Sequence, residues 1–186
     1  MSRTLHLALT ASLILSASAA FAKTKEGVTL PDEIEYAGKK LSLNGLGVRE
    51  ATIFNVKVYV AGLYLEKKSG DGAAIAASAE TKRLVMRFVR DVDQGDLSDA
   101  YKEGFEKVGA LESMKGKVDQ LLKLMSDVKV GDELALSYVP DKGTVVELKG
   151  KERGVIAGAD FAKALFSIWL GASPPNKGLK AGLLGG

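Results

Sequence analysis

The sequence contains no cysteine, and its single histidine, His6, lies close to the N-terminus. The absence of cysteine excludes disulfide bonds, thiolate zinc sites and Cys-His catalysis. A strong excess of one charge is also missing, since 26 Lys and Arg face 23 Asp and Glu. Because no basic run is long enough to follow a phosphate backbone, we expect no nucleic-acid partner.

The first 22 residues have the pattern of a secretory signal peptide. Arg3 supplies a positive start, residues 5–15 form a short apolar stretch, and the Ala-Phe-Ala sequence at 20–22 is a small-residue cleavage site. A membrane anchor is the weaker alternative, because the apolar stretch is short for a spanning helix. We predict a signal peptide at 1–22, cleavage near Ala22, and a periplasmic or secreted protein.

Loss of this leader would change the chemistry more than the size. It would leave 164 of the 186 residues, a length typical of one domain, which we place at 23–186. It would also remove His6, so the mature chain could not use Ser-His-Asp catalysis, a histidine general base or an imidazole zinc site. The most apolar later segment contains Asp160 and Lys163, so we expect no transmembrane span in the mature chain.

The stretch from Leu43 to Leu65 is the densest β-forming run. Even positions from 54 to 60 hold Phe or Val and alternate with Asn, Lys, Tyr and Ala. This period predicts a strand whose even face meets the core and whose odd face is mixed and polar. Residues 50–52 are short enough for a turn, and a hairpin there would put Arg49 and Tyr59 on adjacent strands. We expect any ligand site at this place.

The rest of the chain predicts grouped strands and helices. We expect a connecting segment at 27–31, a helix at 73–79 capped by Asp71, and a helix starting at Asp96. Ser173 before two prolines predicts the start of a last short helix. Further helices are expected at 114–125 and 161–169, and strands at 33–36, 40–48, 82–92, 134–139, 144–148 and 152–156. Grouping of this kind is typical of an α+β fold with helices on an antiparallel sheet.

Each local motif also has a simpler interpretation. The pair Gly45 and Gly47 lacks the third glycine and the following helix of a phosphate loop, so a kink or bulge in a strand is the better local account. Arg49 alone is most often a solvated arginine, and Tyr59 alone a partly buried sheet tyrosine. Neighbouring acids such as Asp91 and Asp93 lack metal-site spacing and are typical of turns and caps. The residues alone therefore indicate an exported α+β domain with a candidate anion-binding arginine.

Four segments together resemble the chalcone isomerase-like family, in its bacterial exported branch. They are GLGVR at 45–49, VKVYVAGLYL at 56–65, RFVRDV at 87–92 and FAKALFSIWLGASPPNKGLKAGLLG at 161–185. Their order covers nearly all of the mature chain. The resemblance implies an open-faced sandwich, with a large antiparallel sheet and a layer of helices on one face.

The resemblance also implies two possible activities. Plant chalcone isomerases cyclise a chalcone to a flavanone without a cofactor, whereas other members of the fold bind fatty acids through an arginine and a tyrosine. Arg49 matches the shared arginine, and Tyr59 falls where the isomerases have a threonine and the fatty-acid binders a tyrosine.

The remaining isomerase positions are not retained. The best match puts Leu97 and Gly104 at the isomerase tyrosine and asparagine, with Tyr101 close by, and Ile168 at a late-helix threonine. Only the arginine of that set is clearly kept, which favours carboxylate binding over ring closure.

Our leading hypothesis is a non-catalytic exported protein that binds a fatty acid or similar amphipathic carboxylate through Arg49 and Tyr59. It assigns no catalytic residue, metal or cofactor. One alternative is a cofactor-free isomerase or lyase of the chalcone isomerase type. A second is a protein-interaction module whose cleft is filled by its own side chains.

Overall fold

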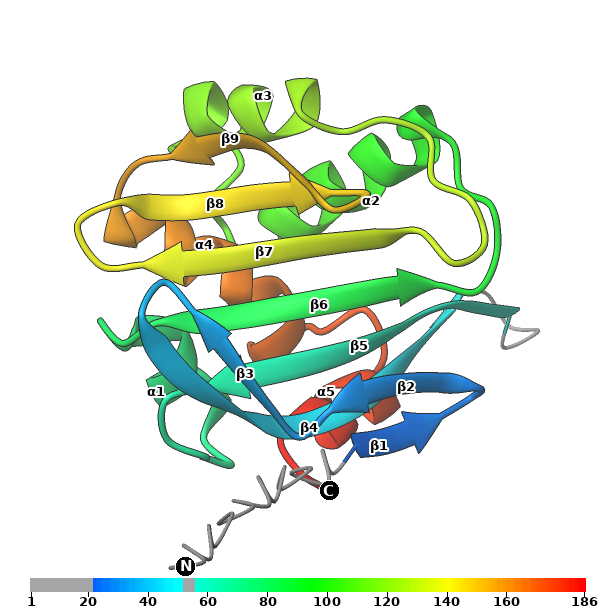
Figure 1. Ribbon diagram of the computed structural model, residues 1–186. Coiled ribbons are helices and arrows are strands. Elements are labelled where there is room, and N and C mark those ends of the chain that lie inside the picture. The colour runs from blue at the N-terminus through cyan, green and yellow to red at the C-terminus, as the bar shows by residue number, and fades with distance from the viewer. Residues whose placement is uncertain (1–21, 52–55) are drawn as a thin grey trace, which may run out of the picture.

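The computed structural model describes residues 22–51 and 56–186 (Figure 1). Within them, seven strands form one curled antiparallel sheet in the order β3-β4-β5-β6-β7-β8-β9. Each strand therefore pairs with its neighbour in the chain. Their bounds are β3 Glu33–Tyr36, β4 Lys39–Ala51, β5 Val56–Leu65, β6 Lys82–Phe88, β7 Glu133–Val139, β8 Gly143–Leu148 and β9 Lys151–Ile156.

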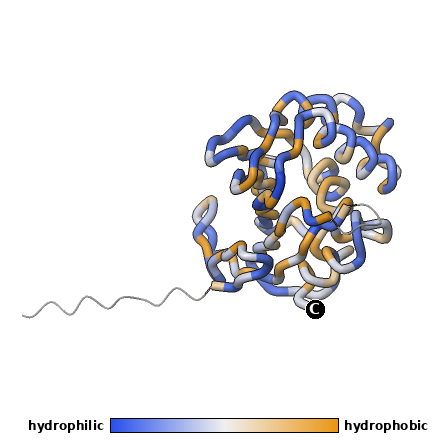
Figure 2. The backbone as a smooth tube through the Cα atoms, turned by 90° about the vertical axis from the view of Figure 1, so that its right-hand side faces the viewer, coloured by the Kyte–Doolittle hydropathy of each residue, from blue (hydrophilic) through white to orange (hydrophobic). Residues whose placement is uncertain are grey.

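Helices pack on one face of this sheet, as Figure 1 shows, and the predicted α+β architecture is confirmed. The main core lies between the two layers, and Figure 2 shows the hydrophobic residues gathered toward the interior. Across the described residues, no helix has the length and apolar character needed to cross a membrane. The helices are α1 Gly72–Ala77, α2 Gln94–Lys107, α3 Lys115–Lys123, α4 Ala159–Leu170 and α5 Lys177–Leu183.

A small hairpin covers part of the other face of the sheet. It consists of β1, Ala22–Lys25, and β2, Val28–Pro31, so the predicted connecting segment at 27–31 is wrong. Val28 and Leu30 alternate with exposed residues and pack into a second, smaller core against the sheet. The Tyr64 hydroxyl donates to Pro31 O at 2.8 Å and ties the hairpin to β5.

This hairpin also corrects the expected faces of β5. Tyr59 and Ala61, on the face predicted to be mixed and polar, belong to the main core under the helices. Val60 and Tyr64 belong to the smaller core on the opposite face. The alternation of residue types was a poor guide because most of this strand is buried on both sides.

Several predicted boundaries are shifted. Glu50 and Ala51 belong to β4 and pair with β5, so the turn predicted at 50–52 is wrong for these two residues, while Thr52 lies outside the described residues. The strand expected at 82–92 ends at Phe88, beyond which Val92 forms only an isolated bridge with Val128.

Helix starts depend on which acceptor reaches the first free backbone N–H groups. Asp71 accepts from Ala73 N and Ala74 N, as predicted. Asp93, and not Asp96, caps α2, so this helix begins two residues earlier than expected. The last helix begins at Lys177, so the two prolines precede it and do not form its first turn.

The glycines of β4 let α5 lie directly on the sheet. A Cβ atom at Gly47 would lie 2.3 Å from Leu179 O, and one at Gly45 only 2.1 Å from Gly182 O. A register shift between Leu43 and Gly45 adds a bulge, which confirms the local interpretation of this glycine pair. This contact fixes the C-terminal segment against the strand that carries Arg49.

Candidate functional site

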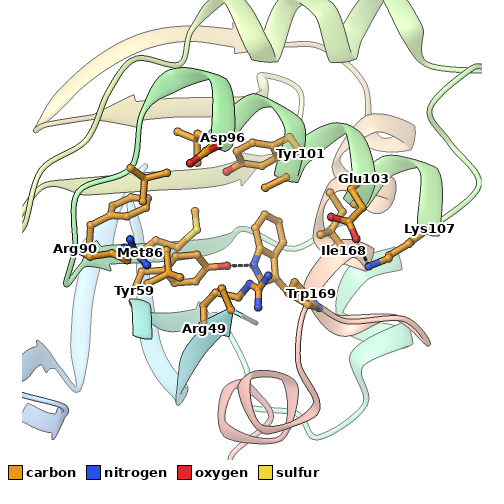
Figure 3. Close-up of a pocket in the computed structure, with 18 of the residues that line it drawn as sticks. Arg49, Tyr59, Met86, Arg90, Asp96, Tyr101, Glu103, Lys107, Ile168 and Trp169 are labelled. Carbon is orange, nitrogen blue, oxygen red and sulfur yellow. Dashed lines mark hydrogen bonds and ion pairs between the residues drawn. The ribbon is translucent and has the colours of Figure 1, made fainter. Parts of the chain in front are cut away.

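A cavity of about 270 Å³ lies between the sheet and the helices α2 and α4 (Figure 3). Its inner wall is apolar and includes Met86, Phe88 and Leu97. Charged side chains surround the opening, among them Arg49 and Arg90. This combination suits a ligand with one charged end and an apolar body.

Arg49 and Tyr59 lie directly opposite each other on β4 and β5, and both line this cavity. The pairing shifts register after Arg49, which leaves Val58 without an opposite residue. Val58 and Tyr59, although neighbours in the chain, both line the cavity. A β-bulge of this kind re-aims side chains, and here it accompanies the predicted juxtaposition of the arginine and the tyrosine.

The Tyr59 hydroxyl is held by a tryptophan from α4. Trp169 Nε1 donates to Tyr59 Oη at 2.9 Å, and Tyr59 is only 8 % exposed. Because the oxygen accepts this bond, the phenol hydrogen is left to be donated to another group. Burial raises the pKa of Tyr59, with smaller opposing effects from Trp169 and Arg49. The phenol therefore stays protonated at neutral pH and acts as a donor.

The backbone around Arg49 is held from the C-terminal segment. Asn176 Nδ2 donates to Val48 O at 3.1 Å, and Glu50 N donates to Asn176 Oδ1 at 3.2 Å. One amide side chain thus binds β4 on both sides of Arg49, just before α5 begins. The Arg49 guanidinium itself donates to Glu50 O. Sequence reasoning missed Asn176, although it lies within the 161–185 segment that carried the family resemblance.

Tyr101 brings a second phenol to the cavity from α2. It is 4 % exposed, and its hydroxyl has no hydrogen-bond partner among the described residues. Its ring packs edge-on against Trp169, with centroids 6.1 Å apart. Burial, and to a smaller extent Tyr59, raises the pKa of Tyr101 well above the usual value. The sequence placed Tyr101 only in an apolar stripe and near an isomerase position.

The three positions matched to polar isomerase residues also line the cavity, but they are apolar here. Leu97 and Gly104 come from α2, and Ile168 comes from α4. A Cβ atom at Gly104 would lie 2.8 Å from Ile168 Cγ2, so the glycine lets the two helices touch. None of these three side chains can form a hydrogen bond.

Charges at the opening are partly paired. Glu103 bonds to Lys107 one turn further along α2, and mainly this contact lowers the pKa of Glu103, with a smaller contribution from Arg49. Asp91 accepts from Lys129 Nζ and from Val130 N, both at 3.0 Å. In the described part of the chain, no group of three or more His, Cys, Asp or Glu is placed to hold a metal ion.

A sequence model of the chalcone isomerase-like family matches residues 22–185. The chain belongs to the chalcone isomerase-like family. No match was found among curated proteins. Among solved structures, the fold is similar to that of the Arabidopsis thaliana fatty-acid binding protein AtFAP1, with a TM-score of 0.74 and 14 % sequence identity. The match covers 88 % of this chain and 96 % of the plant protein, so it shows a shared fold over nearly the whole molecule.

This chalcone isomerase-like protein therefore gathers the five carried-over positions around one cavity, although they are spread over 120 residues of sequence. Arg49 and Tyr59 come from the sheet, and the three apolar positions come from the helices. The structure adds Trp169 and Tyr101 to the wall, and Asn176 behind Arg49.

Proposed function

We propose that this protein binds a fatty acid or similar amphipathic carboxylate in the cavity and catalyses no reaction on it. One observation carries the proposal: Arg49 and Tyr59 face each other across β4 and β5 and line the same cavity. A guanidinium and a donating phenol offer a carboxylate charge-assisted hydrogen bonds, each worth about 1.5–3 kcal/mol. The similarity to a plant protein described as fatty-acid binding supports the same conclusion.

The apolar wall would take the hydrocarbon part of the ligand. Each methylene removed from water contributes about 0.8 kcal/mol. The volume of about 270 Å³ is small beside the range of about 300–1,000 Å³ typical of ligand pockets. We therefore infer that a short or medium acyl chain fits inside, and that a longer one projects from the opening.

An isomerase of the chalcone isomerase type is the second candidate. Tyr101 favours it, because its buried phenol could contact a substrate oxygen. Leu97, Gly104 and Ile168 count against it, because they cannot supply the polar network that the isomerases use. General acid–base groups typically contribute about 10²–10⁴-fold in rate, so we expect chalcone cyclisation near the uncatalysed level. The open cavity argues against the third alternative, a cleft filled by its own side chains.

A titration with a fluorescent fatty acid tests the carboxylate site. Arg49→Lys should lose nearly as much affinity as Arg49→Ala, because an ammonium cannot reproduce the planar two-point contact. Lys57→Ala is the matched control: Lys57 is an exposed cation on β5 that pairs with Glu26 and does not line the cavity. Its affinity should equal that of the wild type. Equal affinity in wild type and Arg49→Ala would contradict the proposal, whereas a lipid co-purified with the wild type, detected by native mass spectrometry, would identify the ligand.

A further inference from the structure

We propose that the ligand carries a second oxygen, a hydroxyl or keto group along its chain, and that Tyr101 donates a hydrogen bond to it. This inference rests on the proposed function and narrows its ligand class. Tyr101 would contact the chain of the acid, whereas Arg49 and Tyr59 would contact its carboxylate head group.

Tyr101 lines the cavity, and its hydroxyl is buried without a hydrogen-bond partner among the described residues. Within residues 22–51 and 56–186, four buried side-chain polar atoms have no hydrogen-bond partner, and of these only Tyr101 Oη belongs to a residue that lines the cavity. Burying a hydroxyl without a partner is costly, so such groups in proteins are normally satisfied. A cavity that keeps a donor in this state is suited to a ligand that brings the acceptor.

Tyr101 and the head-group site lie on different walls of the cavity. Arg49 and Tyr59 come from the sheet, whereas Tyr101 comes from α2 on the opposite wall (Figure 3). The Trp169 ring lies between the two tyrosines, since it donates to Tyr59 Oη and packs edge-on against the Tyr101 ring. The two phenols therefore reach the cavity from different walls, which suits contact with different parts of a ligand.

The unpaired Tyr101 hydroxyl would also make the cavity selective among carboxylic acids. A plain alkyl chain lying against Tyr101 would leave this buried hydroxyl unpaired, whereas an oxygen on the chain could accept its hydrogen. A site with a buried donor discriminates against analogues that lack the acceptor, because the unpaired group then carries its full desolvation cost. The cavity is thus expected to prefer an oxygenated acid to a saturated acid of equal length.

Displacement of a fluorescent fatty acid by decanoic acid and by its 3-, 5- and 7-hydroxy derivatives tests this preference. We expect at least one hydroxy acid to bind the wild type about three- to tenfold more tightly than decanoic acid, the value of one hydrogen bond. In Tyr101→Phe this preference should disappear, while decanoic acid binds at least as tightly as before. Tyr36→Phe is the control, because the Tyr36 hydroxyl bonds to Glu147 and Tyr36 does not line the cavity. This variant should keep the preference.

Three results would overturn the inference: no hydroxy acid preferred by the wild type, a preference that survives in Tyr101→Phe, or one that is lost equally in Tyr36→Phe. In each case, Arg49-dependent binding of decanoic acid would leave the proposed function standing. If none of the acids binds the wild type, the proposed function itself fails. If Tyr101→Phe does not fold, the absence of any preference in the wild type still overturns the inference.

Discussion

The hydrogen bond from Trp169 to Tyr59 determines what the Tyr59 hydroxyl can do for a ligand. The Tyr59 oxygen already accepts the bond from Trp169, so the phenol hydrogen is left for another acceptor. A ligand carboxylate can accept it. Trp169 is also the only tryptophan in the chain. Its emission should therefore change when a ligand enters the cavity, which allows binding to be followed without a label.

Trp169→Phe should weaken fatty-acid binding by about 0.5–1.5 kcal/mol, because Tyr59 loses the donor that orients it. Tyr59→Phe should cost more, about 1.5–3 kcal/mol, since it removes one hydrogen bond to the charged carboxylate of the ligand. The double variant should cost little more than Tyr59→Phe alone, because both changes act through the same phenol. Fully additive losses in a titration with a fluorescent fatty acid would show that the two residues act independently.

Lys82 is a buried cation outside the site. It is 1 % exposed, its ammonium donates to Ser78 O at 2.6 Å, and it lies 4.8 Å from the centre of the Tyr138 ring. Burial lowers the pKa of Lys82 to about 8, opposed in part by Glu80. Between this value and the ordinary 10.5, the folded protein binds fewer protons than the unfolded chain, so stability rises with pH in this window.

The free energy of unfolding should therefore increase by about 1–2 kcal/mol between pH 7.5 and 9.5, since one pKa unit corresponds to about 1.36 kcal/mol. The increase should be absent in Lys82→Met and present in Lys57→Met, where the exposed lysine of β5 is replaced. Above about pH 10, buried tyrosines that keep their protons, such as Tyr59, oppose this trend. Urea denaturation at the two pH values measures the effect, and a flat profile in the wild type would contradict it.

At the scale of elements, the contact between β4 and α5 links stability to the site. Gly47 lies against the backbone of α5, and Asn176, at the start of that helix, holds β4 around Arg49. The Asn44 amide adds a second tie by donating to Leu183 O at 2.8 Å, near the end of α5. Displacing α5 should therefore disturb Arg49 although no residue of the cavity is changed.

Gly47→Ala should destabilise the protein by about 1–3 kcal/mol, because the new methyl group overlaps Leu179 O and the helix must move. Gly116→Ala is the matched control: it lies in α3 with open space around it, and alanine should be neutral or stabilising there. Urea denaturation compares the two variants. Equal midpoints would show that α5 can shift without cost.

At the scale of the whole molecule, the sheet is covered on one face by helices and on part of the other by the hairpin of β1 and β2. The predicted cleavage after Ala22 falls at the first residue of β1 and leaves Lys23 to Lys25 paired with β2. Residues 1–21 lie outside the described residues, so the leader remains a prediction from their sequence.

We expect N-terminal sequencing of the protein from a periplasmic fraction to begin at Lys23, because the segment 20–22 is the only well-placed cleavage site after the apolar stretch. Replacing Ala20 and Ala22 by larger residues should block processing and leave the precursor. Protein from that fraction that still begins near Met1 would contradict the signal-peptide assignment.

The sequence by itself determined the features that depend on neighbouring residues. The alternation in β5 located the strand, Asp71 marked the first helix, and the short spacing between Arg49 and Tyr59 put them on paired strands. These features are local because a hairpin or a cap is formed by residues close in the chain. The order of the family segments added the overall fold.

The tertiary structure alone decided what covers each face and which polar groups meet. The bond from Trp169 to Tyr59 joins residues 110 positions apart, and that from Asn176 to Val48 joins residues 128 apart. Periodicity in a short window reports that a side chain is apolar or alternates, but not which distant element packs on it. Tyr101 shows this best, because its place in an apolar stripe predicted burial. Only the packing of α2 against α4 and the sheet put this residue at the cavity wall and left its buried hydroxyl without a partner among the described residues.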